Sequence, residues 1–158
     1  MKVLFLDIDG VVLPFNVNGK TRDDFDKKSV KVLNRIIEKT DCEIVVSSDW
    51  RNHCTLKQLE NIFEYNGVIK KPIDITPNSI KYDMEGLDVG RVDEIKMWLD
   101  DNKEKHNIEE YCAVDDLDLS ELGPEHFVQC VRPYNEGIKQ TSIEDKIIKR
   151  LTKIEEIV

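Results

Sequence analysis

The chain has 158 residues, of which 40% are hydrophobic, and this length and composition are typical of one folded domain with a single core. Its 23 basic and 32 acidic residues give a net charge of −9. This charge argues against extended non-specific binding to nucleic acid or to membrane surfaces, because both are anionic, but it leaves room for a local basic groove.

The sequence carries no sign of a membrane-spanning or secretory segment. No apolar run approaches the roughly 18 residues that span a bilayer. The apolar stretch from Val3 to Leu6 ends at a carboxylate and is too short for the core of a signal peptide. We therefore expect a cytoplasmic protein without a membrane partner.

Short apolar runs alternate with amphipathic segments, which is the pattern of βαβ units around a parallel sheet. The expected fold is a three-layer α/β Rossmann-like domain that covers residues 1–158. The longest irregular stretch, residues 70–90, is expected to be a surface loop. In chain order, the apolar runs predict strands at residues 3–7, 43–47, 68–73, 111–115 and 127–131, of which 68–73 is the weakest.

Apolar residues at helical spacing predict four helices between and after these strands. The second helix is expected to begin at Thr55, where Gln58 completes a capping-box pattern, and to stop at Asn66 and Gly67. The first helix is expected to start within residues 23–28, the third at residues 90–91 and the last near residue 141.

Acidic side chains follow two of the predicted strands at their carboxyl ends. Asp7 ends the first strand, and Asp9 lies two residues further on, before a glycine that permits a sharp change in backbone direction. Asp115 and Asp116 end the fourth strand in the same way. An Asp in such a place is often only a turn or capping residue. Two such clusters, however, favour a ligand site, because α/β sheets bind ligands at the carboxyl ends of their strands.

Carboxylates gathered at one edge repel one another, by about 4 kcal/mol for a pair at 4 Å with an effective dielectric constant near 20. A hard dication relieves this repulsion, and several oxygen ligands suit Mg²⁺. Because Mg²⁺ usually completes its coordination with water and substrate phosphate, the clusters point to phosphoryl chemistry.

The second predicted strand ends at two hydroxyl side chains, Ser47 and Ser48. Either hydroxyl, together with exposed backbone N–H groups, can hold a phosphoryl oxygen. Arg51 is a candidate cationic clamp on the phosphate, although a surface ion pair is an equally good interpretation. Trp50 is expected to pack against the protein rather than to stack on a substrate.

A cation beside Asp7 would offset the charge of a transferring phosphoryl group. Arg91, at the start of the third predicted helix, is the first candidate for this cation. Lys96 is the second candidate, and an exposed helix lysine is the better interpretation of that residue.

These motifs resemble those of the haloacid dehalogenase-like (HAD) phosphohydrolases, over nearly the whole chain. Residues 7–12 are similar to the family's first motif, Asp-x-Asp-Gly-(Val/Thr), and the pair at 115–116 is similar to the aspartates of the fourth. Ser47, or Ser48 in its place, matches the second motif. Arg91 is similar in position to the cation of the third.

The resemblance implies a sheet with the strand order 5-4-1-2-3, in which these motifs converge. It implies that Asp7 attacks phosphorus and binds Mg²⁺, while Asp9 acts first as general acid and then as base. The backbone carbonyl of Asp9 and the side chain of Asp115 would be further ligands, with Asp116 in or just outside the coordination shell. An acid at Asp9 favours a phosphatase over a dehalogenase, because carbon–halogen cleavage needs no protonated leaving group.

Cap domains in this family are inserted after the first motif or before the third, and neither gap here holds a full cap. The resemblance therefore implies a small capless member with an open site. The candidate substrates are a nucleic-acid end, a nucleotide, a phosphoprotein or a small phosphorylated metabolite. Residues 47–51 also resemble a small capless subgroup that includes domains in RNA-repair-like proteins. Whether residues 70–90 close over the site is left open.

We therefore expect a Mg²⁺-dependent phosphomonoester hydrolase that acts through a phospho-aspartate at Asp7. Two other functions stay open. A non-catalytic HAD-like module that binds phosphate and Mg²⁺ would be favoured if a motif were missing, and all four have candidates. A phospho-accepting receiver domain places its acceptor Asp on the third strand, whereas the Asp-x-Asp pair lies here on the first.

Overall fold

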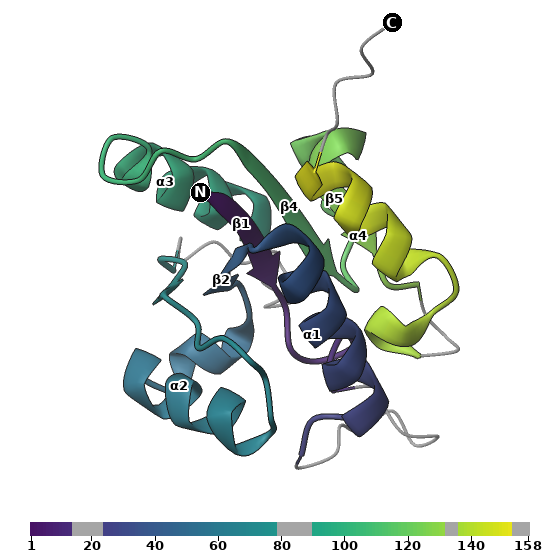
Figure 1. Ribbon diagram of the computed structural model, residues 1–158. Coiled ribbons are helices and arrows are strands. Elements are labelled where there is room, and N and C mark those ends of the chain that lie inside the picture. The colour runs from purple at the N-terminus through teal and green to yellow at the C-terminus, as the bar shows by residue number, and fades with distance from the viewer. Residues whose placement is uncertain (14–23, 79–89, 132–135, 153–158) are drawn as a thin grey trace, which may run out of the picture.

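The computed structural model describes residues 1–13, 24–78, 90–131 and 136–152. Five strands in these residues form one parallel sheet with the order β3-β2-β1-β4-β5 (Figure 1). The predicted order 5-4-1-2-3 is confirmed, because it is the same order counted from the other edge. The strands are β1 (Lys2–Leu6), β2 (Glu43–Val46), β3 (Asp74–Ile75), β4 (Glu110–Asp115) and β5 (Phe127–Gln129).

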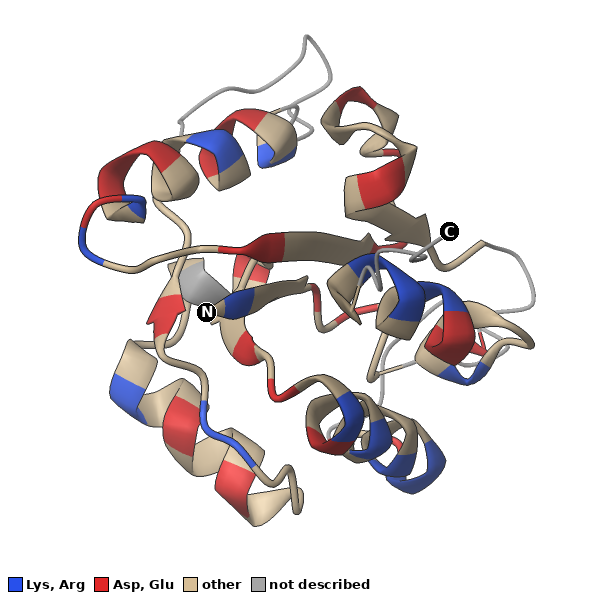
Figure 2. Ribbon diagram, turned by 45° about the horizontal axis from the view of Figure 1, so that its top comes forward, with Lys and Arg blue, Asp and Glu red and all other residues tan. Residues whose placement is uncertain are grey.

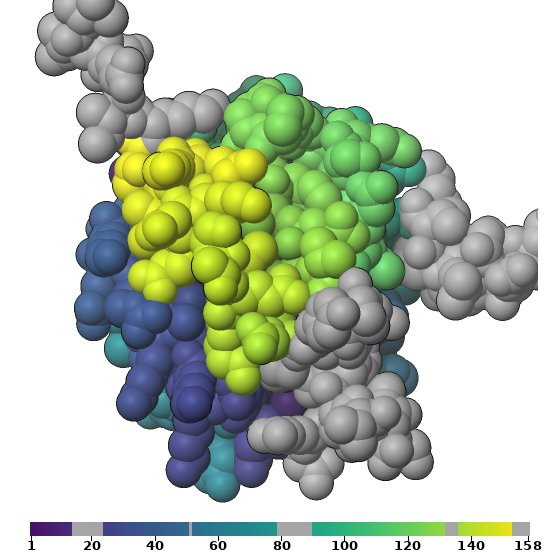
Figure 3. Space-filling model, turned by 90° about the vertical axis from the view of Figure 1, so that its right-hand side faces the viewer, coloured from purple at the N-terminus to yellow at the C-terminus, as the bar shows by residue number. Residues whose placement is uncertain are grey.

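Helices cover both faces of the sheet, so the predicted three-layer α/β architecture is confirmed (Figure 1). The main helices are α1 (Lys27–Thr40), α2 (Leu56–Tyr65), α3 (Arg91–Asn102) and α4 (Ile143–Thr152). Figure 3 shows α4, in yellow, beside α1, in dark blue, on one side of the molecule. Four short 3₁₀ helices complete the described elements: η1 (Asp49–Asn52), η2 (Ser120–Leu122), η3 (Pro124–His126) and η4 (Gly137–Lys139).

The alternation of side chains along β1 divides the core into two parts. Leu4 and Leu6 belong to the cluster that contains the apolar faces of α1, α2 and α4. Val3 and Phe5 point to the other face and pack with Trp98 and its neighbours on α3. Because successive strand residues face opposite sides of a sheet, a strand segment buried on both faces is apolar throughout, as β1 is from Val3 to Leu6.

Local signals in the sequence set the starts of the helices as predicted. Thr55 caps α2 in a capping box with Gln58, and the helix ends at the predicted residues. Asp26 caps α1, where its side chain accepts a hydrogen bond from the backbone N–H of Ser29. Gly90 is the residue before the first turn of α3. These ends fix where each helix leaves the carboxyl edge of the sheet.

The predicted strand at residues 68–73 is wrong. The strand that pairs with β2 is the two-residue segment Asp74–Ile75. Val68 instead closes the end of α2, because its backbone N–H donates to the carbonyl of Phe63 at 3.0 Å and its side chain is buried in the core. Val68 is buried but Ile69 is 52% exposed, so apolar character did not show which residues enter the core or which backbone groups lie beside β2.

Two expectations fall on residues 14–23 and 79–89, which lie outside the described ranges. The absence of a cap domain stays a prediction, and so does the part of the loop expected at residues 70–90 that falls on residues 79–89. The described part of that stretch corrects the expectation of a surface loop, because Asp74 and Ile75 form the sheet strand β3 and Thr76 is buried. None of the helices in the described ranges combines the length and apolar character that crossing a bilayer requires.

Candidate active site

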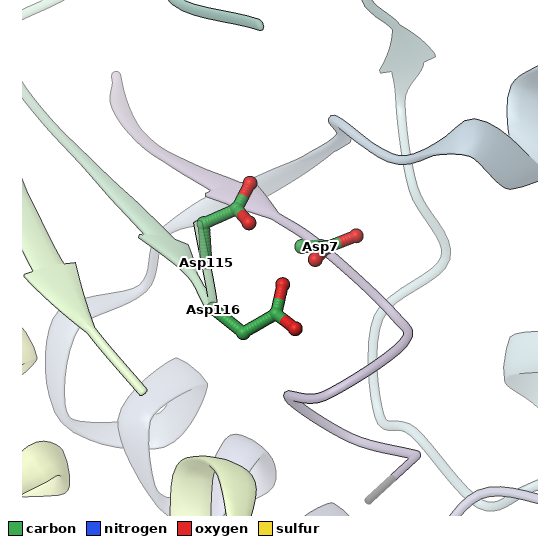
Figure 4. Close-up of side chains that lie close together, drawn as sticks. All are labelled: Asp7, Asp115 and Asp116. Carbon is green, nitrogen blue, oxygen red and sulfur yellow. The ribbon is translucent and has the colours of Figure 1, made fainter. Parts of the chain in front are cut away.

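Three carboxylates meet where β1 and β4 end (Figure 4). The two strands are neighbours, with Leu6 paired to Val114, so Asp7 and Asp115 leave the sheet side by side. Carboxylate oxygens of Asp7, Asp115 and Asp116 lie within 4.8 Å of one another, and Figure 4 shows their side chains turned toward a common centre. Asp7 and Asp115 are only 4% and 1% exposed.

A tight loop after β1 brings the backbone against this cluster. The N–H groups of residues 11–13 all donate to the carbonyl of Ile8, and Gly10 adopts φ +82°. A Cβ atom at Gly10 would lie 2.5 Å from Oδ2 of Asp116. Glycine is therefore required here both by the backbone conformation and by the close approach of the carboxylate.

Burial and mutual repulsion disfavour the ionised forms of the two inner carboxylates. The pKa of Asp7 is well above its ordinary value, because the group is buried and Asp115 and Asp116 repel its charge, although Arg91 opposes this shift. Burial likewise raises the pKa of Asp115 to about 6, against the opposing effect of Arg91. The cluster thus favours uptake of positive charge, as protons or as a metal ion.

Arg91 at the first turn of α3 supplies one cation to the cluster. Its Nη1 donates to Oδ2 of Asp115 at 2.7 Å and to the backbone carbonyl of Ser47 at 3.2 Å, and lies 3.6 Å from Oδ1 of Asp7. Burial lowers the pKa of Arg91, but the neighbouring carboxylates outweigh this effect and the pKa is raised overall. Lys96, the second candidate for this role, lies exposed on α3.

Asp9 is half-buried beside the cluster and is held by Trp50. The indole Nε1 of Trp50 donates to Oδ2 of Asp9 at 3.1 Å, while Oδ1 is buried and makes no hydrogen bond within the described residues. Burial raises the pKa of Asp9, and the Trp50 hydrogen bond partly offsets this. A carboxyl group with a raised pKa is suited to give and take a proton.

The two serines after β2 are both buried, with 1% exposure each. The hydroxyl of Ser47 has no hydrogen-bond partner among the described residues, although its backbone carbonyl accepts from Arg91. Ser48 caps η1, where its hydroxyl accepts from the N–H of Trp50 at 3.4 Å. The backbone of Arg51 lies in η1, and the side chain of this residue is outside the described part of the structure.

Several of these residues line a small pocket. The pocket has a volume of about 190 Å³, and a second hollow of about 470 Å³ shares Arg91 and Leu117 with it. The first volume suits a phosphate-sized group. The pocket is lined by Asp7, Asp9, Ser48, Asp49, Arg91, Asp116 and Leu117.

The donor set fits a hard divalent cation. Three carboxylates with oxygens within 4.8 Å share one close arginine, so negative charge exceeds positive charge at their centre. All the candidate ligand atoms are oxygens, without sulfur or imidazole, and such a set favours Mg²⁺ over zinc or copper.

Two site residues were not predicted from the sequence. Asp49 lines the pocket and lies 3.4 Å from Nη2 of Arg91, and Trp50 reaches Asp9 from η1. Both stand directly after the predicted serine pair and within residues 47–51, so their adjacency and the subgroup resemblance of that segment are the signals that point to them. The sequence otherwise gives no means of seeing that η1 folds back over Asp9.

Comparison with known proteins identifies the family. No curated protein and no solved structure shows a significant match to the chain. A family model described as the HAD domain in Swiss Army Knife RNA repair proteins matches residues 3–143, well over half of the chain. The matched range contains both aspartate pairs, both serines and Arg91. The chain therefore belongs to this family of HAD-like phosphohydrolase domains.

Proposed function

We propose that this chain is a single-domain, capless hydrolase that cleaves phosphomonoesters with Mg²⁺ through a phospho-aspartate at Asp7. One observation carries the proposal: oxygens of Asp7, Asp115 and Asp116 lie within 4.8 Å of one another, in contact with buried Arg91. Membership of the HAD family supports the reaction class.

Asp7, Asp115 and Asp116 would hold the metal ion, with the backbone carbonyl of Asp9 as a further oxygen. When bound, Mg²⁺ would neutralise charge that develops on the transferring phosphoryl group. Nη1 of Arg91 lies 3.6 Å from Oδ1 of Asp7. At this distance Arg91 would favour the ionised form of Asp7 and help to orient its carboxylate.

The chemistry divides into two halves that the side chains can perform. In the first, an oxygen of Asp7 bonds to phosphorus as the ester P–O bond breaks, and Asp9 gives its proton to the departing oxygen. In the second, Asp9 takes a proton from water, whose oxygen bonds to phosphorus as the bond to Asp7 breaks. Inorganic phosphate leaves, and the Asp7 carboxylate is restored.

The phosphate oxygens need donors during both halves. The hydroxyl of Ser47 is a candidate, because it is buried without a partner in the described residues. Ser48 lines the pocket and is the other candidate. Arg51 keeps its proposed role as a clamp on the substrate phosphate. The substrate is a phosphorylated molecule, and the family's description favours a nucleic-acid end among the candidates.

Turnover tests this proposal directly. The wild type is expected to hydrolyse an aryl phosphate with Mg²⁺, and to form an acid-stable phosphoryl adduct that peptide mass spectrometry locates at Asp7. Asp7→Asn should abolish both signals. Asp41→Asn is the matched control, because the Asp41 side chain is 92% exposed in an ion pair with Lys70 outside the site. Absence of turnover and adduct in a folded wild type, across aryl, nucleotide and oligonucleotide phosphates, would leave only the non-catalytic module.

A further inference from the structure

The outer face of α1 is basic, although the protein as a whole is acidic. The helix carries five basic residues and one acidic residue, a net charge of +4, whereas the whole chain has −9. Four of the basic residues follow one another at four-residue spacing, and the fifth lies beside them. These five exposed residues, the α1 basic face, are Lys27, Lys28, Lys31, Arg35 and Lys39.

This charge is not a general property of the described helices. The residues of α2 sum to −1, those of α3 to −2 and those of α4 to +1. Figure 2 shows the blue of Lys and Arg repeating along α1, with red and tan prevailing on α2 and α3. Among the four α-helices, α1 therefore carries the largest net positive charge, while α4 has three basic residues against two acidic ones.

The arrangement costs the helix stability. Like charges four residues apart on a helix repel one another, and lysines in the first turn oppose the helix dipole. Glu144 of α4 offsets the repulsion at the far end, where its carboxylate lies 2.6 Å from Arg35 and 3.9 Å from Lys39. Lys27, Lys28 and Lys31 have no carboxylate within ion-pair distance in the described parts of the chain. Residues that break such local rules are expected at functional positions.

The uncompensated end of α1 is the end nearest the candidate active site. Trp50, which holds Asp9, packs edge-on against Phe25 with ring centroids 6.2 Å apart. Phe25 precedes the cap residue Asp26, whose backbone N–H donates to the carbonyl of Val12 in the loop that follows Asp7 and Asp9. The basic face therefore begins at the edge of the sheet where the catalytic carboxylates lie.

We propose that Lys27, Lys28 and Lys31 dock the phosphodiester backbone of a single-stranded nucleic acid whose phosphorylated end enters the pocket at Asp7. The proposal rests on the proposed function and names its substrate class. Residues four apart on a helix rise by about 6 Å, a distance comparable to the spacing of phosphates along an extended strand. These contacts go to the backbone, so they confer position without base preference. Their confinement to one helix agrees with the weak general affinity expected from the net charge.

Binding and turnover, measured separately, test this surface. The test variant is Lys27→Ala/Lys28→Ala/Lys31→Ala. The control is Lys71→Ala/Lys103→Ala/Lys105→Ala, which removes the same charge from exposed positions at the opposite edge of the sheet, after α2 and after α3. Each set is placed in the Asp7→Asn background, and binding of a fluorescein-labelled RNA with a terminal phosphate is followed by anisotropy over a series of KCl concentrations.

The test variant should lose roughly 10- to 100-fold in affinity near 0.1 M salt, with the slope of log K against log [KCl] reduced by about 2, since single strands contribute about 0.7 per phosphate contact. The control should match the Asp7→Asn protein. With Asp7 intact, all three proteins should hydrolyse an aryl phosphate equally. If the protein binds RNA in a salt-dependent way and the test variant loses this binding, the proposed RNA surface is supported. If the same protein shows no turnover, only the proposed hydrolase function is refuted. Equal RNA affinity in the test and control variants would overturn the proposed surface. So would competition by polyglutamate that displaces the labelled RNA as well as unlabelled RNA does.

Discussion

The indole Nε1 of Trp50 donates a 3.1 Å hydrogen bond to Oδ2 of Asp9, although the two residues are 41 positions apart in the sequence. The Trp50 ring packs against Phe25, which packs edge-on against Phe63 of α2 with centroids 5.4 Å apart. The core thus anchors Trp50, and Trp50 fixes the carboxyl group of Asp9. Oδ1 of Asp9 is buried without a hydrogen-bond partner in the described residues, and in the proposed reaction it would be the oxygen that carries the proton.

Trp50→Phe removes this hydrogen bond and keeps an aromatic ring against Phe25. If Trp50 positions the general acid, kcat for an alkyl phosphate should fall about tenfold, a part of the full 10²–10⁴ that a general acid contributes. The loss should be much smaller for dinitrophenyl phosphate, whose leaving group needs no proton. Steady-state kinetics across a series of leaving groups measures this dependence.

Trp98→Phe is the matched control, because the Trp98 indole also donates to a carboxylate, that of Asp74, at 2.8 Å. It should lower activity equally for all leaving groups or not at all. The indole N–H resonance of Trp50 should also shift in Asp9→Asn, while that of Trp98 stays in place. If the loss of kcat in Trp50→Phe is the same for all leaving groups, Trp50 acts only through packing and does not position the general acid.

Gly10→Ala should weaken metal binding more than it weakens the fold. Its Cβ would displace the Asp116 carboxylate, which lies 2.5 Å from the added atom. Disturbance of a metal site of this kind typically costs about 10- to 100-fold in affinity. The Mg²⁺ dependence of the unfolding temperature, with and without excess metal, measures this effect.

Gly67→Ala separates backbone strain from the clash. Gly67 has a similar φ of +80°, but a Cβ there meets no atom within 4 Å. Both variants should lose about 1–2 kcal/mol of stability from the left-handed conformation. Only Gly10→Ala should lose Mg²⁺ affinity, and an equal loss in both would contradict this account.

The stability of the metal-free protein should fall as pH rises from about 4 to about 6. The pKa of Asp115 is about 6 in the folded state, against about 3.9 for an unfolded aspartate, so the folded protein binds more protons in this window. Burial raises the pKa of Asp7 in the same direction. In the proposed site, Mg²⁺ would bind the ionised carboxylates and should therefore oppose the trend.

Urea unfolding of the metal-free protein at pH 5 and pH 7 checks the sign of this dependence. Asp115→Asn should flatten it, while Asp41→Asn, at an exposed site, should leave it unchanged. If the metal-free wild type is more stable at pH 7 than at pH 5, the expected sign is wrong. The ionised carboxylates would then be stabilised in the folded protein without a metal ion.

Ser47→Ala and Ser48→Ala should differ in their effects on kinetics. The Ser47 hydroxyl is buried without a partner in the described residues, so its removal costs no internal hydrogen bond. Ser47→Ala is expected to lower kcat/KM roughly tenfold through one lost phosphate contact, with little change in stability. Ser48→Ala should also lower stability, because it removes the cap of η1. Unchanged kcat/KM in Ser47→Ala, with a loss in Ser48→Ala, would assign the second-motif hydroxyl to Ser48.

Much of the fold was predictable because it depends on local patterns. The apolar run of β1 and the Asp at its end place Asp7 at the sheet edge, and the capping box at Thr55 fixes the start of α2. The convergence of Asp7 with Asp115 follows from the strand order, which only the family resemblance indicated. Arg91 is the first candidate for the cation because it stands at the first turn of α3, and the structure places it against Asp115 while Lys96 lies exposed.

The features that could not be predicted depend on contacts between distant segments. The edge strand β3 has two residues, and its place is set by backbone bonds such as that from Ile73 N–H to the carbonyl of Ile44, which apolar patterning does not encode. The bond between Trp50 and Asp9 likewise requires η1 to fold back over the first loop. A tryptophan beside a polar turn gives no sign of which carboxylate its N–H will meet.

The central position of β1 has a consequence for the dynamics of the site. The amide of Asp7 is bonded to the carbonyl of Val114 on one side of the strand, and the carbonyl of Leu6 is bonded to the amide of Ser47 on the other. These bonds open only if β1 separates from both of its neighbouring strands at the centre of the sheet. Hydrogen exchange at the Asp7 amide should therefore proceed only through global unfolding, so that the proposed nucleophile is among the slowest-exchanging positions of the protein.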